Sequence, residues 1–480
     1  MNRSTLFLIL MVQAVLFSQQ KFSDLHSEID AGNYKRANYI IDSLLVFTQL
    51  SELEKYDLSF QKELMDRIEK DFTRNEDYIF NQLKKYYPQL TIEMIESWES
   101  TKALEVKLIN GEKRYFKNAV SNLFRIDKAA KKVKLNVDGV GQNTLAKFLS
   151  EHIPSLVKES ELTKRELLKP TKFRINYTLT VKPDVVPDGE IIRCWLPFPR
   201  QDNIRQKNIN LKEVNNANYL ISGNEIAHSS IYLEKVAVVN KPTTFSYELE
   251  YLSYGTFIKL DDKKEYNISK NSEVFKSFTS EQLPHIHFSD RIKEISKTII
   301  GTEKNSFKKV KMIIKWLTEN IPWASAREYS TLNAISDYCL ENMHGDCGIK
   351  SLLFITLCRY NGIPAKWQSG WMLHPGSVNL HDWAEVYFDE FGWITVDPDF
   401  GIQESNNDMV KYFYASGIDS YRYIVNDDYG KPLCPAKIYP RSETVDFQRG
   451  EVEWQGGNLY FDKWNYDMKV TYLSDDENEK

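Results

Sequence analysis

Two short segments, 381–388 and 392–397, alternate apolar and polar residues so regularly that they strongly constrain the local structure of the chain. Such alternation predicts a pair of half-buried strands joined by a three-residue turn. Placing Phe388 opposite Gly392 makes one face of the pair wholly apolar. That face carries Ala384, Val386, Phe388, Ile394 and Val396. A slip of one residue would mix the two faces, so the apolar pattern itself selects this register.

The polar face of the same strand pair carries His381 and Asp397, displaced diagonally by two residues. Side chains so placed are close enough to share a hydrogen bond. A carboxylate that holds an imidazole fixes the tautomer that can accept a proton from a nucleophile. We therefore expect His381 to act as a general base and Asp397 to orient it. The neighbouring Asp382 belongs to the opposite face, which makes it a poor candidate for the orienting role.

A candidate nucleophile, Cys347, lies upstream of these strands. The sequence Gly-Asp-Cys-Gly at 345–348 opens an apolar helical run that ends at Asn-Gly-Ile-Pro, 361–364. At the start of a helix, unpaired backbone N–H groups and the positive end of the dipole stabilise a thiolate and can face a developing oxyanion. We therefore expect Cys347 to be a thiolate at neutral pH. Cys358, further along the apolar run, is more typical of core packing.

Three motifs thus follow one another: HGDCGIKSLLFITLCRYNGIPAKWQSGWML, then HDWAEVYFDE, then FGWITVDPDFG. Over roughly residues 305–402 they resemble the transglutaminase-like superfamily, with its Cys at a helix start, its H-x-W-x-E-V strand and its G-W-x-x-x-D-P strand. The resemblance implies a papain-like core with a Cys347 nucleophile, a His381 base and an Asp397 orienter. Trp323 is our candidate for the side chain that completes the oxyanion hole. The superfamily includes peptide hydrolases and members that have lost catalysis, so the resemblance does not choose the reaction.

The chain has 480 residues, which predicts more than one domain, because single cores rarely grow beyond about 300 residues. The predicted class is α+β: a papain-like transglutaminase core with a preceding β-sandwich domain and an N-terminal helical module. We expect a signal peptide (1–18), the helical module (20–168) with an Asn-Gly hairpin near 105–116, the β-sandwich domain (170–260), the catalytic core (300–403), an aromatic-rich C-terminal extension (404–472) and a disordered tail (473–480).

Two of these boundaries depend on local patterns. Helical character runs from about 142 to 168 and is expected to stop at Pro170, after which strict alternation from Phe173 to Val181 predicts a strand. The WLPFPR stretch at 195–200 is similar to the β domain that precedes the core in bacterial members of the superfamily. Residues 410–472 contain fourteen Phe, Trp or Tyr. These could line a substrate cleft, but ordinary β packing is the favoured interpretation, because aromatic residues are good strand formers.

The first residues indicate export. After Asn2 and Arg3, the segment from Leu6 to Phe17 is apolar except for Gln13. It is shorter than the roughly 20 residues of a transmembrane helix, so a secretory signal peptide is favoured over a buried N-terminal helix. We expect a periplasmic or extracellular protein that is not an integral membrane protein.

Charge and cysteine usage exclude several classes of partner and cofactor. Lys and Arg number 62 against 67 Asp and Glu, a net charge of −5, so nucleic acid is not an expected partner. The five cysteines lack C-x-x-C spacing, which argues against a zinc site or a disulfide scaffold, and their odd number leaves one thiol over. They are Cys194, Cys339, Cys347, Cys358 and Cys434. His285 and His287 could present two ligands, but nothing nearby completes a metal set; we expect no metal and no cofactor. His344 is a weak rival base, and His374 a loop residue near the cleft.

The sequence thus predicts an exported thiol enzyme that acts on peptide or side-chain amides of a protein or peptide substrate through a Cys347 thioester. Hydrolysis, as in a peptidase or deamidase, is favoured because water is always available and no amine site can be recognised. One alternative is a protein cross-linking transglutaminase. Another is a catalytically vestigial binding or assembly protein of the cell envelope. A third makes every cysteine structural and predicts a disulfide at Cys347. The sequence does not specify an oligomeric state.

Overall fold

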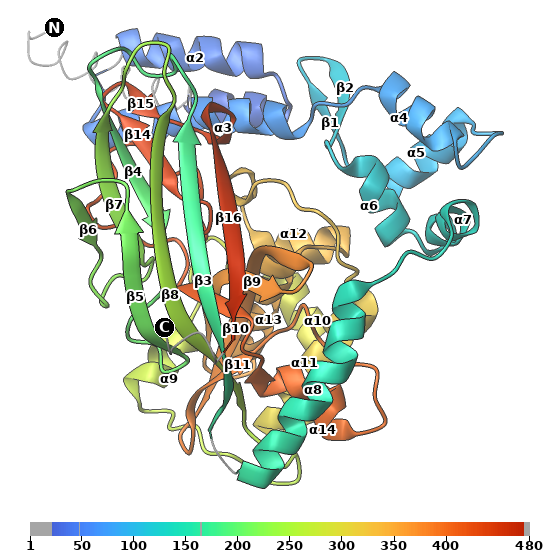
Figure 1. Ribbon diagram of the computed structural model, residues 1–480. Helices are drawn as coiled ribbons and strands as arrows, with labels where there is room; N and C mark the ends of the chain where they lie inside the picture. Colours follow the sequence, from blue (N-terminus) through green and yellow to red (C-terminus); the bar gives the residue numbers. More distant parts are fainter. Residues whose placement is uncertain (1–21, 48, 164–165, 475–480) are drawn as a thin grey trace, which may run out of the picture. The chain divides into compact units, whose positions relative to one another are not determined.

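The computed structural model describes residues 22–47, 49–163 and 166–474 (Figure 1). The chain divides between Val140 and Gly141 into two compact units. The signal peptide expected over 1–18 lies outside the described residues, as does most of the expected tail. None of the helices in the described ranges is both long and apolar enough to cross a membrane.

The first unit is helical with one hairpin. Its described elements are a helix over 22–30, α2 (Tyr34–Phe47), α3 (Glu52–Asp71), α4 (Glu76–Lys84), α5 (Ile92–Ser100), β1 (Val106–Ile109), β2 (Glu112–Tyr115), α6 (Ala119–Ile126) and α7 (Lys128–Asp138). The predicted hairpin is confirmed: Ile109 pairs with Glu112. Asn110 and Gly111 form the turn with φ of 49° and 83°. Positive φ at both turn residues is what a tight two-residue hairpin requires, and Asn-Gly supplies it at least cost.

The helical module ends earlier than the sequence pattern predicts. Helix α8 (Thr144–Thr163) belongs to the second unit, where its apolar face packs against Phe257 and Trp383. The helix also stops well before Pro170, which lies inside strand β3 (Leu167–Val181). The pairing of this strand is irregular between Leu167 and Pro170, so the missing N–H of proline breaks no regular ladder there.

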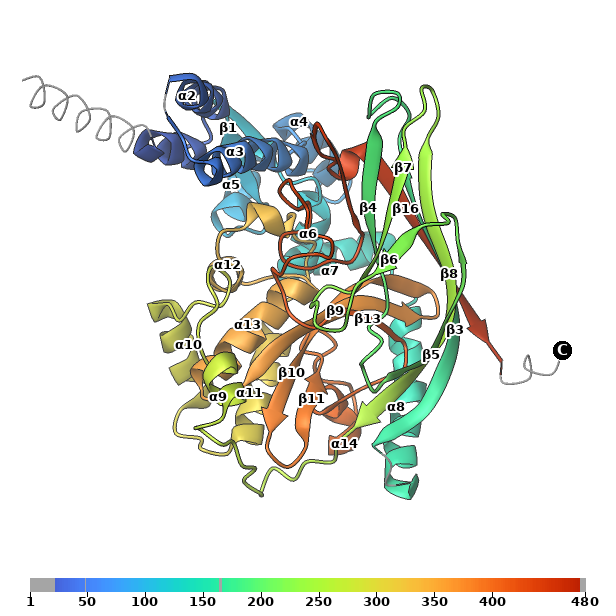
Figure 2. The ribbon, with the colours of Figure 1, turned by 90° about the vertical axis from the view of Figure 1, so that its left-hand side faces the viewer.

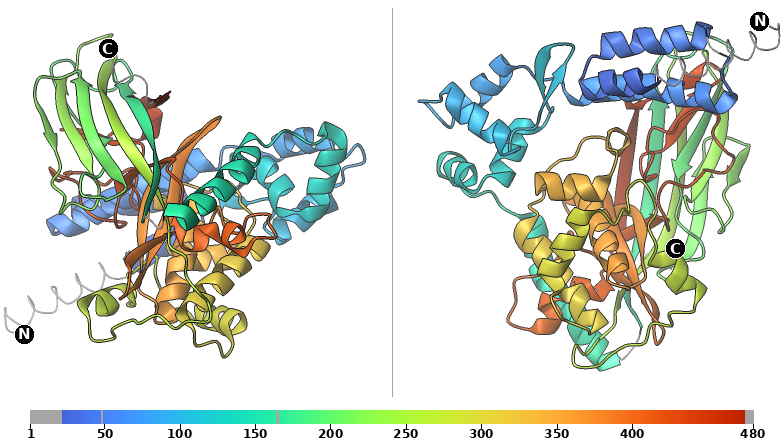
Figure 3. Two further views of the ribbon diagram at one scale, coloured as in Figure 1. Left: turned by 60° about the horizontal axis from the view of Figure 1, so that its bottom comes forward. Right: turned by 180° about the vertical axis from the view of Figure 1, so that it is seen from behind.

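The second unit contains a β-sandwich built from two five-stranded antiparallel sheets. One sheet has the order β12–β8–β3–β16 with β5 also on β8, and the other has the order β15–β14–β4–β7–β6. The strands are β4 (Ile191–Pro197), β5 (Gln206–Val214), β6 (Tyr219–Ile221), β7 (Ser230–Val236), β8 (Thr243–Phe257), β12 (Gly417–Ile418), β14 (Glu451–Trp454), β15 (Gly457–Asn458) and β16 (Trp464–Leu473). Side chains of both sheets, such as Tyr177 and Trp195, share one hydrophobic core. Figure 3, left, shows the green strands of the first sheet side by side.

The aromatic-rich segment 404–472 is part of the sheets and not an appended extension. Four of its strands complete the sandwich, and β13 (Arg422–Asn426) joins a third sheet. Tyr423, Phe447 and Trp464 are buried in the sandwich core, as expected for ordinary β packing. Strand β16 also includes Leu473, the first residue of the expected tail.

The remaining part of the unit is a helical layer on a four-stranded antiparallel sheet of order β11–β10–β9–β13. It comprises α9 (Glu273–Phe278), α10 (Asp290–Ile300), α11 (Ser306–Asn320), α12 (Ile335–Asn342), α13 (Cys347–Tyr360), β9 (Ala365–His374), β10 (Ser377–Phe388), β11 (Gly392–Val396), α14 (Asp408–Lys411) and the short 3₁₀ helices Tyr329–Thr331 and Phe413–Ala415. A further 3₁₀ helix, Phe461–Lys463, directly precedes β16 and packs on the sandwich. Figure 2 shows α10, α11 and α13 on one side of this sheet and β3, β5 and β8 on the other. The α+β class predicted from the sequence is confirmed.

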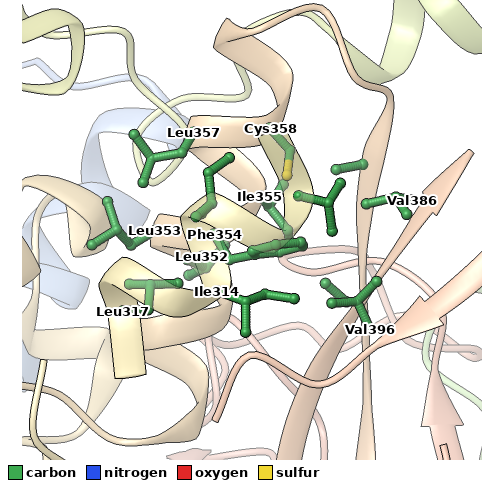
Figure 4. Packing of buried hydrophobic residues seen from close by; sticks show 14 of the residues in the cluster. Ile314, Leu317, Leu352, Leu353, Phe354, Ile355, Leu357, Cys358, Val386 and Val396 are labelled. Atoms are coloured by element: carbon green, nitrogen blue, oxygen red, sulfur yellow. The ribbon is translucent and has the colours of Figure 1, made fainter. Parts of the chain in front are cut away.

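Helix α13 is the centre of this layer. Leu352, Phe354 and Ile355 are fully buried among residues of α11 and of strands β10 and β11 (Figure 4). Val386 and Val396 contribute the apolar face that the sequence pattern predicts. Apolar burial on every side of the helix fixes its position against the sheet, and therefore fixes where its first residue lies.

Candidate active site

Cys347 is the first residue of helix α13, as the sequence predicts. The residue before it, Asp346, caps the helix by accepting a hydrogen bond of 3.1 Å from the backbone N–H of Ile349. The hydroxyl of Tyr329 donates to the same oxygen, Asp346 Oδ1, at 2.8 Å. Because Tyr329, from a separate segment, holds the capping residue, the start of the helix is fixed, and the position of the Cys347 thiol is fixed with it.

The second helical residue, Gly348, lies against the same tyrosine. A Cβ atom at this position would be 2.1 Å from the Tyr329 hydroxyl oxygen and 2.8 Å from Asp382 Oδ2. Only a glycine therefore allows the helix start to pack so closely on these two polar groups.

His381 and Asp397 come together through the register that the apolar pattern predicts. Strand β10 pairs with β11 with Phe388 opposite Gly392, and Ala384 opposite Val396. This register brings His381 Nε2 to 2.7 Å from Asp397 Oδ2. Both side chains are buried, at 2 % and 0 % exposure, so water does not weaken the contact.

Asp397 is held as a carboxylate by four hydrogen bonds. Besides His381, Arg422 Nη2 donates to Oδ2 at 3.0 Å. The backbone N–H groups of Phe400 and Asp399 donate to Oδ1 at 3.0 and 3.2 Å. Burial alone would raise the pKa of Asp397, but His381, Arg422 and the Phe400 N–H outweigh it and lower that pKa. The ionised carboxylate accepts a hydrogen bond from Nε2–H, which leaves Nδ1 as the basic nitrogen of His381.

Arg422 connects Asp397 to a second buried carboxylate, Asp419. Its Nη1 lies 3.2 Å from Asp419 Oδ1, and both side chains are fully buried. His374, expected on a loop, instead ends strand β9 and lies 3.2 Å from the same oxygen. Burial raises the free energy of an ionised Asp419, but Arg422 and His374 overcome this and hold its pKa well below the usual range. This network fixes Arg422, and through it the carboxylate behind His381.

The thiol of Cys347 donates to Asp382 Oδ2 at 3.3 Å. Asp382 lies on the face of β10 opposite His381, as predicted, and this is the face toward the helix start. The surroundings of the thiol work against the expected thiolate. Burial, then the nearby carboxyl groups of Asp382, Asp346 and Asp399, raise the pKa of Cys347 well above its ordinary value. These groups outweigh the helix dipole, which is worth typically about 0.3–1 kcal/mol.

Asp382 is clamped by Gln448, a residue from the segment before β14. Gln448 Nε2 donates to Asp382 Oδ1 at 2.7 Å and to the backbone carbonyl of His381 at 2.9 Å. One amide thus holds both neighbours in place. Burial, followed by the charge of Asp446, raises the pKa of Asp382 well above its ordinary value, which favours the protonated acid.

A cleft of about 380 Å³ connects these groups, and Cys347, His381, Asp382 and Trp323 all line it. Trp323, the candidate for the oxyanion hole, is 41 % exposed. Its backbone bridges to Gly345, two residues before the thiol. Trp323 is therefore placed beside the helix start.

The other candidates lie elsewhere or in other roles. His344 and His285 are buried, and His287 Nδ1 lies 3.1 Å from Asp337 Oδ2. Across the described ranges, no group of three or more His, Cys, Asp or Glu side chains is arranged to hold a metal ion. All five cysteines, Cys347 included, are free thiols, so the leftover single thiol expected from their odd number is not what the structure shows.

Sequence reasoning missed Arg422, Gln448 and Tyr329. None of them belongs to a motif with fixed spacing to Cys347 or His381, and two come from the aromatic-rich segment. One signal was present: Arg422 opens an otherwise apolar strand, RYIV, where a charged residue needs a buried partner.

Comparison with protein families identifies the region that holds Cys347, His381 and Asp397. Residues 293–398 match the model of the transglutaminase-like superfamily. This part of the chain, which includes Cys347, His381 and Asp397, is therefore a transglutaminase-like domain. The chain is also similar to an uncharacterized protein, YebA, of Bacillus subtilis (strain 168), with 30 % identity over 168 residues. That match covers 30 % of this chain and 22 % of the relative, so the chain spans about a fifth of the relative's length.

Two solved structures are similar in part. One is described as a candidate cysteine protease from Cytophaga hutchinsonii, with 16 % identity, a TM-score of 0.43, and coverage of 65 % of this chain and 93 % of that one. The other is the periplasmic domain of TgpA from Pseudomonas aeruginosa, with 11 % identity, a TM-score of 0.24, and coverage of 50 % of this chain and 90 % of that one.

Proposed function

We propose that this chain is an exported thiol enzyme that acts on peptide or side-chain amides, with Cys347 as nucleophile, His381 as general base and Asp397 as the group that orients the imidazole. The observation that carries the proposal is the buried 2.7 Å contact between His381 and Asp397, in one cleft with a cysteine at a helix start. Nucleophile, base and orienter in one site are the requirements of acyl transfer through a covalent intermediate.

In the first half-reaction, Cys347 Sγ attacks the amide carbonyl carbon while its proton passes to His381 Nδ1. The hydrogen bond to Asp382 must be released for this transfer. In this proposal the tetrahedral oxyanion accepts a hydrogen bond from the backbone N–H of Cys347, and Trp323 is the candidate for the second donor. When the C–N bond breaks, His381 returns the proton to the leaving amine, and a thioester remains on Cys347.

In the second half-reaction, a nucleophile attacks the thioester carbon and His381 accepts its proton. Water gives a carboxylate and makes the enzyme a peptidase or deamidase. A primary amine gives a new amide and makes it a cross-linking transglutaminase. We favour hydrolysis, because water is available in any open cleft.

A second candidate function is a binding or assembly protein of the cell envelope with a thiol core that has lost catalysis. The observation that favours it is the hydrogen bond of 3.3 Å that the Cys347 thiol donates to Asp382 Oδ2, in which the sulfur keeps its proton. The two candidates differ in one property: only the enzyme forms a thioester.

The proposal is tested by mass spectrometry of the purified protein with a fluorogenic glutamine peptide, with and without a primary amine. We expect a transient acyl adduct on Cys347 and release of an acid product, or of an amide product when the amine is present. Cys347→Ala should abolish both.

The matched control is Cys434→Ala, which removes a partly buried thiol that does not line the cleft. It should keep full turnover. If a panel of amide peptides gives no adduct on Cys347 and no product, the binding function is supported and the enzyme is excluded.

A further inference from the structure

The cleft around Cys347 is lined by more acidic than basic side chains. The acidic residues are Glu328, Asp346, Asp382, Asp399, Glu443 and Asp446. The arginines that line it are Arg327 and Arg449. A cleft lined mainly by charges of one sign concentrates ligands of the opposite charge. The question is which of the carboxyl groups remains available to a ligand.

Most of these groups have partners within the protein. Arg449 lies 2.7 Å from Glu328 and 2.6 Å from Glu443. Lys350 Nζ lies 2.8 Å from Asp399 Oδ1. Asp346 and Asp382 accept the hydrogen bonds described above.

Asp446 is different. Its residue is 6 % exposed, and it lines the cleft that holds Cys347. Arg441 Nη2 donates to the backbone carbonyl of Asp446, and no described residue donates a hydrogen bond to its carboxyl group. The nearest cations are engaged elsewhere: Arg449 holds two glutamates, and Arg441 donates to the backbone carbonyls of Lys431 and Asp446. The Asp446 oxygens are not among the fully buried polar atoms that lack a partner, so they are open to the cleft, where a ligand with N–H groups can donate to them.

We propose that Asp446 binds a positively charged amino group of the substrate beside Cys347. This inference rests on the proposed function and narrows its substrate class to amides presented together with an ammonium group. The ammonium can belong to the amide substrate itself or to an amine that accepts the acyl group. In both cases the ammonium binds the same carboxyl group. An ammonium of the amide substrate acts in the first half-reaction, and that of an acceptor amine in the second.

The charge of this subsite depends on pH. The groups that face Asp446 are Glu443, Arg441 and Arg449 on its own segment, Glu328 and Tyr329 on the loop before α12, and Asp382 on β10. Burial, then the charge of Glu443, raises the pKa of Asp446 well above its ordinary value. The subsite therefore gains negative charge as the pH rises, and its attraction for a cation should grow.

The test compares two thiol reagents of opposite permanent charge on the full-length protein: 2-(trimethylammonium)ethyl and 2-sulfonatoethyl methanethiosulfonate. The readout is the ratio of their rates at Cys347, divided by the same ratio for mercaptoethanol. Both reagents need the same thiolate, so its population cancels. We expect the cation to be favoured about tenfold or more, and the preference to increase as the pH rises.

Asp446→Asn keeps the size of the side chain and should reduce the preference at least about fivefold and remove its rise with pH. The matched control Asp467→Asn removes an exposed carboxylate of β16, outside the cleft, and should leave the ratio unchanged. If Asp446→Asn does not fold, as judged by circular dichroism, the wild-type ratio and its pH dependence decide alone. A wild-type ratio near that of mercaptoethanol, or an Asp446→Asn ratio equal to wild type, overturns the proposal.

Modification by these reagents requires only an accessible thiol, so the result stands whether or not amide turnover is found. If turnover is found, two further experiments identify which molecule carries the ammonium group. A lysine peptide preferred over its norleucine counterpart, with the preference lost in Asp446→Asn, assigns the ammonium to the amide substrate. Cadaverine incorporation lost in the same variant assigns it to the acceptor. If neither depends on Asp446, the proposal is wrong.

Discussion

Two aspartates of the cleft, Asp382 and Asp397, differ in the charge that their surroundings favour. Asp397 accepts from an arginine, an imidazole and two backbone N–H groups, and its pKa is lowered. Asp382 accepts from neutral donors only and faces another carboxyl group, and its pKa is raised. The same residue type is thus suited to hold a cationic imidazolium at one position and to hold a neutral thiol at the other.

This difference predicts the outcome of substituting each aspartate by asparagine. Asp397→Asn should lower kcat by about 10²–10⁴-fold and leave a measurable remnant, because the imidazole survives but is misoriented for part of the time. Asp382→Asn should cost less than tenfold, because it keeps the Gln448 contact in one amide orientation and relieves the thiol of a carboxyl group. The measurement is turnover of an amide peptide by folded variants.

The controls for this series are Cys347→Ala and His381→Ala. Each should abolish turnover, and the double variant should be hardly worse than either single one, since residues that act as a unit are not additive. If Asp382→Asn proved more damaging than Asp397→Asn, the assignment of Asp397 as orienter would be wrong.

The residues that the sequence could predict are those governed by local patterns. His381 and Asp397 follow from a period-two alternation within 17 consecutive residues, and Cys347 from helix start signals. Gln448 could not be found this way, because its contact with His381 joins residues 67 positions apart and depends on the path of an irregular segment. Asp446 lies in the same segment and was missed for the same reason.

At the scale of the elements, every residue of strand β9 is buried. It is the inner neighbour of both β10 and β13, and Gly370 lies opposite His381 on one side and Ile424 on the other. A Cβ at Gly370 would be 1.9 Å from the backbone oxygen of Tyr423. The close approach of β13 places Arg422 beside Asp397. The packing of β13 on β9 and the geometry of the site therefore both depend on position 370 being a glycine.

Gly370→Ala should therefore lower the free energy of unfolding by roughly 3 kcal/mol, because the two strands must separate to admit the methyl group. Turnover per folded molecule should fall as well, since Arg422 moves with β13. Urea denaturation and kinetic assays of the same preparation give both values. Gly141→Ala, where nothing lies within 4 Å of the added atom, is the matched control and should change neither. Equal stability of the two variants would contradict the close packing of β9 and β13.

Element prediction from the sequence was most successful where one face of an element is buried. The strand over 173–181, the helix that begins at Cys347 and the hairpin at Asn110 were all predicted and are present. The domain boundaries were less successful, because they depend on which units share a core. The sequence of α8 predicts a helix whichever unit it belongs to. Only its contacts with Phe257 and Trp383 assign it to the second unit.

On the scale of the whole molecule, burial of carboxyl groups in the cleft couples the fold to pH. Burial raises the pKa of Asp346 to about 6 from its ordinary value of 3.8. The folded state then binds more protons than the unfolded state between these values. Stability attributable to this group is therefore present at low pH and is lost as the pH rises through the folded pKa.

Asp346→Asn should be more stable than the wild type above pH 6 and similar to it at pH 4. Asparagine is an equally good helix cap, so the substitution removes the titration and keeps the cap. The difference in free energy of unfolding should grow with pH to at most about 3 kcal/mol. Urea denaturation at pH 4.5 and pH 7.5 measures it. A difference that does not change with pH would show that Asp346 ionises as easily in the folded protein as in the unfolded chain.

Strand β3 pairs with β16, with Val181 opposite Trp464 and Lys172 opposite Leu473. This pairing limits how early the sandwich can fold during synthesis of the chain. A ribosome adds about 5–20 residues per second, so strand β3 leaves it roughly 15–60 seconds before its partner exists. During that interval one edge of β3 has no strand beside it and is open to pairing with other nascent chains. The sandwich can close only after almost everything else in the second unit has been translated, and a chain that ends before Arg449 would lack part of the cleft lining.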